Sequence, residues 1–175
     1  MRPFRVPRGM DNGAEHDLAQ KIRAAAPSAY VGAAIFRGDL SVHIVRDGLL
    51  PVCRLLRDDP ALDFDYPVHI TSVDYPNDAD RFEVVYEFFS IRKKHRIRLK
   101  TRVPEDDCTV ESLTALWPGA NYLEREVYDM MGIRFKNHPE LKRILLPDDY
   151  DEGYPLRKNF PIQGRGWRDN FDFPL

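Results

Sequence analysis

The sequence predicts an α+β fold: a two-layer mixed sheet in the order α-β(2)-α-β(3) with helices on one face, followed by a short helix and an extended C-terminal arm. Apolar residues recur at helical spacing near the N terminus and again after residue 48. Between residues 66 and 103 apolar and polar residues alternate, as in half-buried strands. The last quarter is rich in proline and charge, which indicates an extended segment.

Composition limits the kinds of protein this chain can be. Its 175 residues suffice for one domain and an extension, and 26 Lys and Arg nearly balance 28 Asp and Glu. This balance gives no general attraction to nucleic acid or anionic lipid. No apolar run approaches the roughly 20 residues of a transmembrane helix, so we expect membrane contact only through partner proteins. Residues 1–15 lack the apolar centre of a signal peptide, which predicts a flexible N-terminal segment on a cytosolic chain.

The first half of the domain is predicted as helix, hairpin and helix. Leu18, Ile22 and Ala25 follow helical spacing within 16–26, and a proline ends the run. Residues 30–36 and 40–45 are rich in β-forming residues, and Gly38 supplies the turn between them. An apolar face then predicts a helix from residue 49 up to the Asp-Asp-Pro sequence at 58–60.

Three further strands are predicted at 66–75, 81–91 and 96–103. In the last two strands, apolar side chains lie opposite each other only if the numbers of two paired residues add up to an odd number. We expect Glu87 to pair with Lys100, which meets this condition. The run from residue 91 to 102 holds seven Lys or Arg, more than the strand carboxylates can match. A nucleic-acid-binding module using this basic strand, 92–102, is therefore the alternative from another functional class. Against it, the neighbouring aromatic residues belong to the face expected to be buried.

Two helices should follow the sheet. Residues 110–116 are predicted as a short helix, and 121–131 as an amphipathic one. In the second, Asn121 and Glu124 have capping-box spacing, and Gly132 occupies the position where helices often end. Arg125 and Asp129 are expected to pair with each other on the side of the helix away from the domain.

The segment after residue 134 is expected to be an arm, and two courses for it remain open. Prolines recur along it, and between them lie more apolar residues than a disordered tail carries. Such an arm either folds along another protein, which we favour, or straps across its own domain. We therefore expect domain boundaries at 1–15 for the N-terminal segment, 16–134 for the α/β domain and 135–175 for a partner-binding arm.

No catalytic or metal-binding motif is apparent. Cys53 and Cys108 are far apart and lack a second ligand at metal spacing, and the five histidines are scattered. The acidic cluster at 148–152 does not have the ligand spacing of a calcium loop. Glu124 and Glu126 diverge by about 200° on a helix and cannot share a substrate. We expect no bound cofactor and no catalysis by the isolated chain.

Three stretches within 117–161 form a dense motif: LEREVYDMMGIRF, NHPELKRILLPDDY and GYPLRKNFP. Together they resemble the 30-kDa-type subunit of respiratory complex I, which is the C-type subunit of NADH-quinone oxidoreductase, and its J-type counterpart in chloroplasts. The chain departs from the family pattern at Asn137, where glycine is usual, and at Asn159, where aspartate is usual. The turn at 151–153 is also one residue longer than in many members.

The resemblance implies a role in assembly. It implies a cofactor-free subunit of a proton-translocating complex, packing on the large quinone-site subunit and neighbouring Fe–S subunits, with FMN and Fe–S clusters held by partners. It places the chain peripherally, on the cytoplasmic side of the bacterial inner membrane. A ferredoxin- or hydrogenase-linked relative is the alternative. The motif residues carried over as partner-binding are Glu124, Arg125, Glu126, Tyr128, Asp129, Gly132, His138, Pro139, Pro147, Pro155, Leu156, Arg157 and Lys158.

Overall fold

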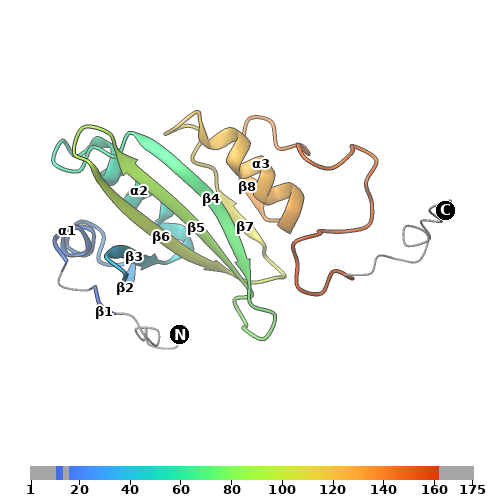
Figure 1. The fold of residues 1–175 in the computed structure, drawn as a ribbon, viewed down its shortest axis with the longest axis horizontal. Coiled ribbons are helices and arrows are strands. Elements are labelled where there is room, and N and C mark those ends of the chain that lie inside the picture. Colours follow the sequence, from blue (N-terminus) through green and yellow to red (C-terminus); the bar gives the residue numbers. More distant parts are fainter. Residues whose placement is uncertain (1–10, 14–15, 162–175) are drawn as a thin grey trace, which may run out of the picture.

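The computed structural model describes residues 11–13 and 16–161, and they form a twisted sheet with helices beside it and an irregular arm (Figure 1). In chain order the elements are β1 (Asp11–Asn12), α1 (Asp17–Ala25), β2 (Tyr30–Phe36), β3 (Asp39–Ile44), the 3-10 turn η1 (Arg46–Gly48), α2 (Leu49–Asp58), β4 (Tyr66–Asp74), β5 (Phe82–Ser90), β6 (His95–Val103), β7 (Thr109–Glu111), α3 (Ala120–Met131) and β8 (Arg134–Lys136).

The main sheet is mixed, as the sequence predicts. Its strand order is β1-β2-β3-β6-β5-β4. Strands β3 and β6 are parallel, and the other neighbours are antiparallel. The short edge strand β1 was not expected, because two residues carry no periodicity that a sequence pattern can reveal. The predicted α+β fold is otherwise confirmed.

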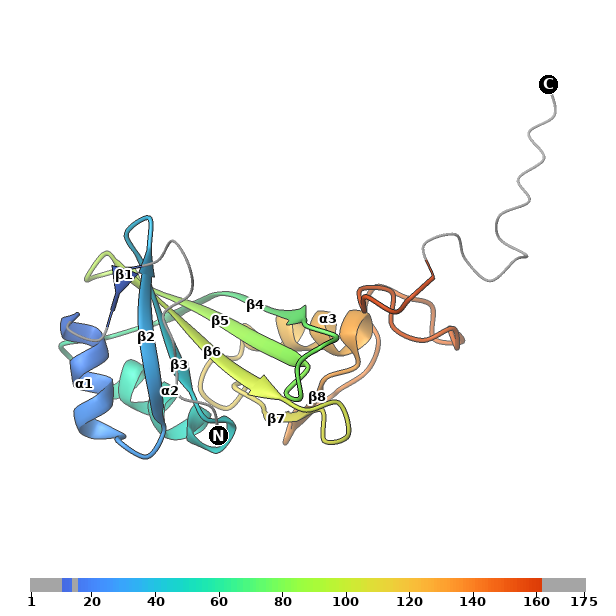
Figure 2. The ribbon, with the colours of Figure 1, turned by 90° about the horizontal axis from the view of Figure 1, so that it is seen from below.

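One face of the sheet and the helices enclose a single core. Figure 2 shows α1 and α2 on one side of the sheet, with α3 beyond the β4 edge. Phe82, Tyr86 and Phe88 point into this core from β5, and Trp117 packs against Phe88 with ring centroids 4.7 Å apart. The opposite face carries charged residues and no helix among those described. The helices therefore lie on one face, as the alternation of side chains requires.

The pairing of β5 with β6 differs from the prediction by two residues. Glu87 pairs with Arg98 rather than Lys100, so the connecting loop is 91–94 instead of 92–95. A slip of two keeps every side chain on its predicted face, because the side-chain period of a strand is two. Alternation therefore determines the face but not the register.

The helix predicted at 110–116 is wrong. Thr109–Glu111 is strand β7, which pairs in parallel with β8, and residues 114–116 form a turn. The pairing partner lies more than twenty residues along the chain, beyond the reach of a local pattern. The boundary expected at 134/135 falls inside β8, and the division into domain and arm stays an expectation.

Helix α3 begins one residue earlier than predicted and without the predicted cap. Gly119 precedes it and provides no side-chain hydrogen bond, so the Asn121 capping box is wrong. Glu124 points into the protein instead of back to the helix start. Gly132 does end the helix, with φ +75 and its N–H donating to the Tyr128 carbonyl, as predicted.

After β8 the chain has no helix or strand through residue 161. In Figure 1 this part loops out beyond α3, and its last described residues return beside the end of β4. Among the described residues no helix has the length and apolar character needed to cross a membrane. Most of the predicted N-terminal segment, and residues 162–175 of the predicted arm, lie outside the described residues.

Candidate partner-binding site

The Asp129 carboxylate organises the first loop of the arm. Its Oδ2 accepts hydrogen bonds from the backbone N–H groups of residues 144, 145 and 146 at 3.1, 2.8 and 2.8 Å. Its Oδ1 accepts from Arg143 Nη1 at 2.7 Å. Burial alone would raise the pKa of Asp129, but these donors together hold it below its ordinary value. A single side chain of α3 thus fixes the shape of loop 143–146.

Two arginines also hold this loop, one on α3 and one in the loop itself. Arg125, on α3, donates to the carbonyls of Lys142 and Arg143 at 3.1 and 2.9 Å. Arg143 also donates to the Tyr150 carbonyl at 2.8 Å, which draws the next turn inward. The expected pairing of Arg125 with Asp129 on the outer side of α3 is therefore wrong. Both are buried, because each satisfies arm groups rather than the other.

A second attachment lies at the C-terminal end of α3. Arg157 Nε donates to the Met131 carbonyl at 2.8 Å, and the Leu156 N–H donates to the Met130 carbonyl at 3.1 Å. The Arg157 guanidinium also lies over the Tyr154 ring, 4.5 Å from its centroid. A Cβ atom on Gly132 would come within 2.4 Å of Tyr154 and 2.8 Å of Arg157. Glycine is required there for both backbone conformation and space.

Sequence reasoning missed a third attachment, at the end of β4. Arg81 and Asp74 form a buried two-point ion pair, with 2.7 and 2.8 Å contacts. Arg81 also binds Glu105 at 2.7 Å and the Asn159 side-chain oxygen at 3.0 Å, while Asp74 accepts from the Lys158 N–H at 2.8 Å. An aspartate at 159 would meet the same arginine, so this departure from the family pattern keeps the contact. No local pattern marks Asp74 or Arg81, because their partners are distant in sequence.

Glu124 and His138 are buried between α3 and the start of the arm. Glu124 accepts from the Ser112 hydroxyl at 2.6 Å and from the Leu113 N–H at 2.7 Å. Burial outweighs these bonds and raises the pKa of Glu124 to about 7. His138 Nδ1 accepts from the Glu140 N–H, so Nε2 carries the proton and donates to the Asn121 carbonyl. Both side chains connect structural elements of this chain.

Asn137, the other departure from the family pattern, has φ +61. Asparagine tolerates this left-handed conformation better than most residues, which explains how it replaces glycine. Its side chain also donates to Glu111 at 2.8 Å. The departure therefore leaves the local turn intact.

The outer side of the same region is apolar and uncovered. Leu145 and Leu156 are each 60% exposed and Tyr122 is 65% exposed, although their neighbours in sequence are firmly bound. Ile144 is exposed as well. We call Tyr122, Ile144, Leu145 and Leu156 the arm surface. Exposed apolar side chains on a held backbone are typical of protein interfaces.

The predicted site residues divide between these two roles. Arg125, Asp129, His138 and Arg157 hold the arm to its own domain, Gly132 leaves room for it, and Glu124 joins α3 to residues 112 and 113. Leu156 and Glu126 face outward, as does the Lys158 side chain. The Tyr128 carbonyl accepts the bond that ends α3, and the Pro147 carbonyl accepts from the Tyr150 N–H. Pro155 is half-buried, and Pro139 is exposed. Most of the motif thus shapes the arm, and a few members are left for a partner.

The basic strand is better neutralised than the sequence suggested. Arg98 binds Glu87, and Lys100 and Arg102 share Glu83. Other partners come from outside β5: Arg96 binds Asp39 of β3, and Arg92 binds Asp63. The surplus of positive charge is therefore smaller than expected, because loops and a third strand supply carboxylates that a two-strand view omits, and only Lys93 and Lys94 of the seven cations form no ion pair with a described residue. No group of three or more metal-ligating side chains occurs among the described residues.

Comparison with known proteins agrees with this architecture. The family model described as "Respiratory-chain NADH dehydrogenase, 30 Kd subunit" matches residues 42–166. A protein of Roseiflexus sp. strain RS-1, named as the C-type subunit of NADH-quinone oxidoreductase, is 51% identical over 145 residues, 83% of each chain. A protein of the same name from Hyphomonas neptunium is 46% identical over 156 residues, 89% of this chain and 76% of that one.

Two solved structures share the fold. A trypsin-resistant fragment of Nqo5 superposes with a TM-score of 0.60 and 31% identity, covering 71% of this chain and 98% of the fragment. A chain of the membrane-bound sulfane sulfur reductase, an archaeal respiratory membrane complex, superposes with a TM-score of 0.71 and 25% identity, covering 83% of this chain and 85% of that one. With the family match spanning most of the sheet, α3 and the arm, the chain belongs to the family of the 30-kDa subunit of respiratory-chain NADH dehydrogenase.

Proposed function

We propose that this chain is a cofactor-free assembly subunit in the peripheral arm of a proton-translocating NADH-quinone oxidoreductase. It sits on the cytoplasmic side of the bacterial inner membrane and packs on the large quinone-site subunit, next to Fe–S subunits. FMN and Fe–S clusters in those partners carry electrons from NADH to quinone, and this chain keeps the partners in place. The relatives named as the C-type subunit of NADH-quinone oxidoreductase support this proposal.

The single observation that carries the proposal is the two-sided arm. Its inner side is tied to the domain by Asp129, Arg157 and Asp74. On its outer side Leu145 and Leu156 are exposed to solvent, although these hydrogen bonds restrain the backbone that carries them. Ordering an arm costs conformational entropy on binding, and a shape formed in advance reduces that cost. The arm is thus both a strap on its own domain and a preformed surface for a partner.

A second candidate differs only in the electron donor. One structural neighbour is a chain of an archaeal respiratory complex named for sulfane sulfur reduction. This likeness supports the idea that the same fold is used in complexes with different redox partners. A ferredoxin- or hydrogenase-linked complex would use the same arm. The NADH-linked assignment is preferred because the curated relatives at 41–51% identity carry that name.

The proposal predicts that the double substitution Leu145→Ser and Leu156→Ser lowers the yield of assembled complex about tenfold, since burying a leucine contributes roughly 1.5–3 kcal/mol. NADH-quinone reductase activity per cell should fall in proportion, while activity per assembled complex stays normal. Native gel electrophoresis with in-gel activity measures both quantities.

Phe36→Ser is the matched control, because Phe36 is also exposed but lies on the β2–β3 hairpin away from the arm. Unfolding of the purified chains should be unchanged within about 0.5 kcal/mol in all variants. Normal yield of complex with collapsed turnover would instead indicate a direct catalytic role. Normal yield with normal turnover would remove the arm surface from the interface.

A further inference from the structure

We infer that the arm surface continues across α3 onto the start of β4, and that Glu126, between the two, receives an arginine or lysine from the partner subunit. This inference rests on the proposed function, because the cation is sought on the same subunit that covers the arm surface. It assigns Glu126 as one half of an ion pair between two subunits.

Helix α3 runs beside β4 along the length of the strand (Figure 1). At the start of the helix, a Cβ atom on Gly119 would lie 3.9 Å from the Pro67 ring. At its end, residues 157 and 158 bind the Met131 carbonyl and the carboxylate of Asp74, the last residue of β4. The outward sides of the helix and of the strand therefore adjoin each other.

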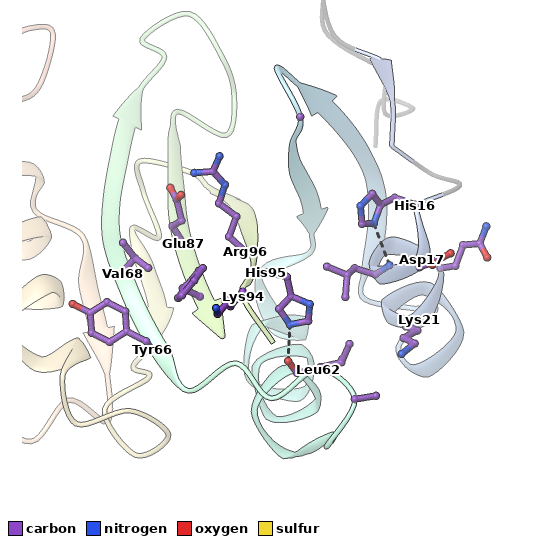
Figure 3. A pocket seen from close by; sticks show the side chains of 15 residues that line it. His16, Asp17, Lys21, Leu62, Tyr66, Val68, Glu87, Lys94, His95 and Arg96 are labelled. Carbon is purple, nitrogen blue, oxygen red and sulfur yellow. Dashed lines mark hydrogen bonds between the residues drawn. The ribbon is translucent and has the colours of Figure 1, made fainter. Parts of the chain in front are cut away.

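This region carries most of the exposed large apolar side chains. Among the described residues, only Phe36 and Ile91 of that class lie outside β4, the residue after it, α3 and the arm. Figure 3 shows two of them, Tyr66 and Val68, on β4 where they line one side of a pocket. They flank Pro67, against which α3 begins, so they extend the apolar arm surface onto the edge of the sheet.

Glu126 places a charge within this apolar surface. Successive residues of a helix are 100° apart, so the neighbours of Glu126 on the helix are Tyr122, Leu123 and Met130, at i−4, i−3 and i+4. Tyr122 is exposed, and Leu123 and Met130 are half-buried. The Glu126 side chain is itself exposed. This side of α3 is thus apolar apart from one carboxylate.

No cation of the described chain neutralises Glu126. It forms no ion pair or hydrogen bond with any residue that the structure describes. Three arginines lie around α3, and each is engaged elsewhere: Arg125 binds loop carbonyls, Arg143 binds the Asp129 carboxylate, and Arg157 binds the carbonyl at the end of the helix. Solvent therefore stabilises the Glu126 charge in this chain.

A partner that covers Tyr122 and its neighbours removes this solvent. Burying an ionised carboxylate without a partner is strongly unfavourable, whereas a hydrogen-bonded cation compensates for the lost hydration. The surface opposite Glu126 must therefore carry a cation among apolar side chains. Arginine suits this position well, because its planar guanidinium can bind both carboxylate oxygens and can stack on an aromatic ring such as Tyr122. A nucleic acid would instead be repelled by the same carboxylate.

Charge reversal at residue 126 tests the inference in the whole complex. We expect Glu126→Arg to lower the yield of assembled complex at least about fivefold and the isosteric Glu126→Gln about two- to threefold, because both leave the partner's cation without a carboxylate. The purified variant chains should unfold as the native chain does, because Glu126 binds no described residue. Asp47→Arg, which reverses a 93% exposed carboxylate just before α2, is the matched control and should leave the yield unchanged. Native gel electrophoresis measures the yield.

Photo-cross-linking identifies the residue that meets Glu126. The chain carries p-benzoylphenylalanine at position 68, 122 or 156, the assembled complex is irradiated, and mass spectrometry locates the adducts. All three positions should capture one subunit, and the peptide captured at 122 should hold an arginine or lysine among apolar residues. Changing that cation to glutamate should lower the yield of complex, and combining this change with Glu126→Arg should restore about half of the yield or more.

Several outcomes would overturn the inference. They are a normal yield with Glu126→Arg, an adduct at 122 without a cation, capture at 68 or 122 of a different subunit or of nothing while 156 cross-links normally, and an exchange of charges that does not restore assembly. If Leu145→Ser with Leu156→Ser still lowers the yield, the proposed function stands without the ion pair. Normal assembly with both sets of variants would overturn the proposed function as well.

Discussion

Glu124 is a buried acid whose protonation is coupled to folding. Its side chain has no exposed surface and its oxygens meet Ser112 and Leu113, with His138 Nε2 4.0 Å away. The ring nitrogen facing it already donates to the Asn121 carbonyl, so no full charge compensates the carboxylate. Burial therefore favours the protonated form in the folded chain.

This coupling predicts a stability that falls as pH rises. The pKa of Glu124 is raised from 4.5 to about 7 on folding, so its contribution is complete below pH 4.5 and is lost as pH passes through 7. Between pH 5 and 8 the free energy of unfolding of the native chain should fall by about 3 kcal/mol relative to that of Glu124→Gln, whose amide resembles the neutral acid. Urea unfolding of both proteins across this range measures the difference. Parallel pH profiles would contradict the prediction.

In contrast to Glu124, Asp129 must be ionised so that both of its carboxylate oxygens can accept hydrogen bonds. In Asp129→Asn the amide can accept from the three N–H groups only by turning its NH₂ group toward Arg143, where two donors face each other. We expect a loss of about 2–4 kcal/mol and faster trypsin cleavage after Lys142 and Arg143. Unfolding and timed proteolysis measure the two effects. Glu126→Gln, at an exposed position on the same helix, is the control and should change neither.

At the scale of elements, Gly132 both ends α3 and lies in contact with the arm. Gly132→Ala adds a methyl group that must displace Tyr154 and Arg157, and it also strains a backbone at φ +75. The sum should reach about 2–4 kcal/mol. Gly38→Ala has a similar φ of +84 but open space, so it should cost only about 1–2 kcal/mol. Equal losses in thermal or urea unfolding would show that steric contact at residue 132 is unimportant.

Strand pairing shows the same dependence on distant groups. The alternation in β5 and β6 predicts which side chains enter the core, and Phe82, Tyr86 and Phe88 do so. The register was two residues away from the prediction, because cross-strand charge pairs also involve β3 and loop carboxylates. The partner of Arg96, for example, is Asp39. A two-strand comparison contains too few of the interacting groups to select one register.

At the scale of the whole molecule, one continuous core joins the sheet, α2 and α3. The arm surface follows α3, whose start lies against Pro67 near the beginning of β4 and whose end holds Leu156 through the Met130 carbonyl. A close-packed core leaves this surface little freedom to move relative to the sheet. The molecule therefore presents the arm surface on a rigid support.

The sequence by itself determined the element types, the faces of the strands and the family, because helical periodicity, alternation and the motif are local properties. It predicted helices near 16–26 and 49–59, and the strands from 66 to 103. Only the tertiary structure decided the pairing of β7 with β8, the role of Glu124, and the three attachments at Asp129, Arg157 and Asp74. Those features join residues far apart in the chain, and a local pattern contains no information about partners that folding alone brings together.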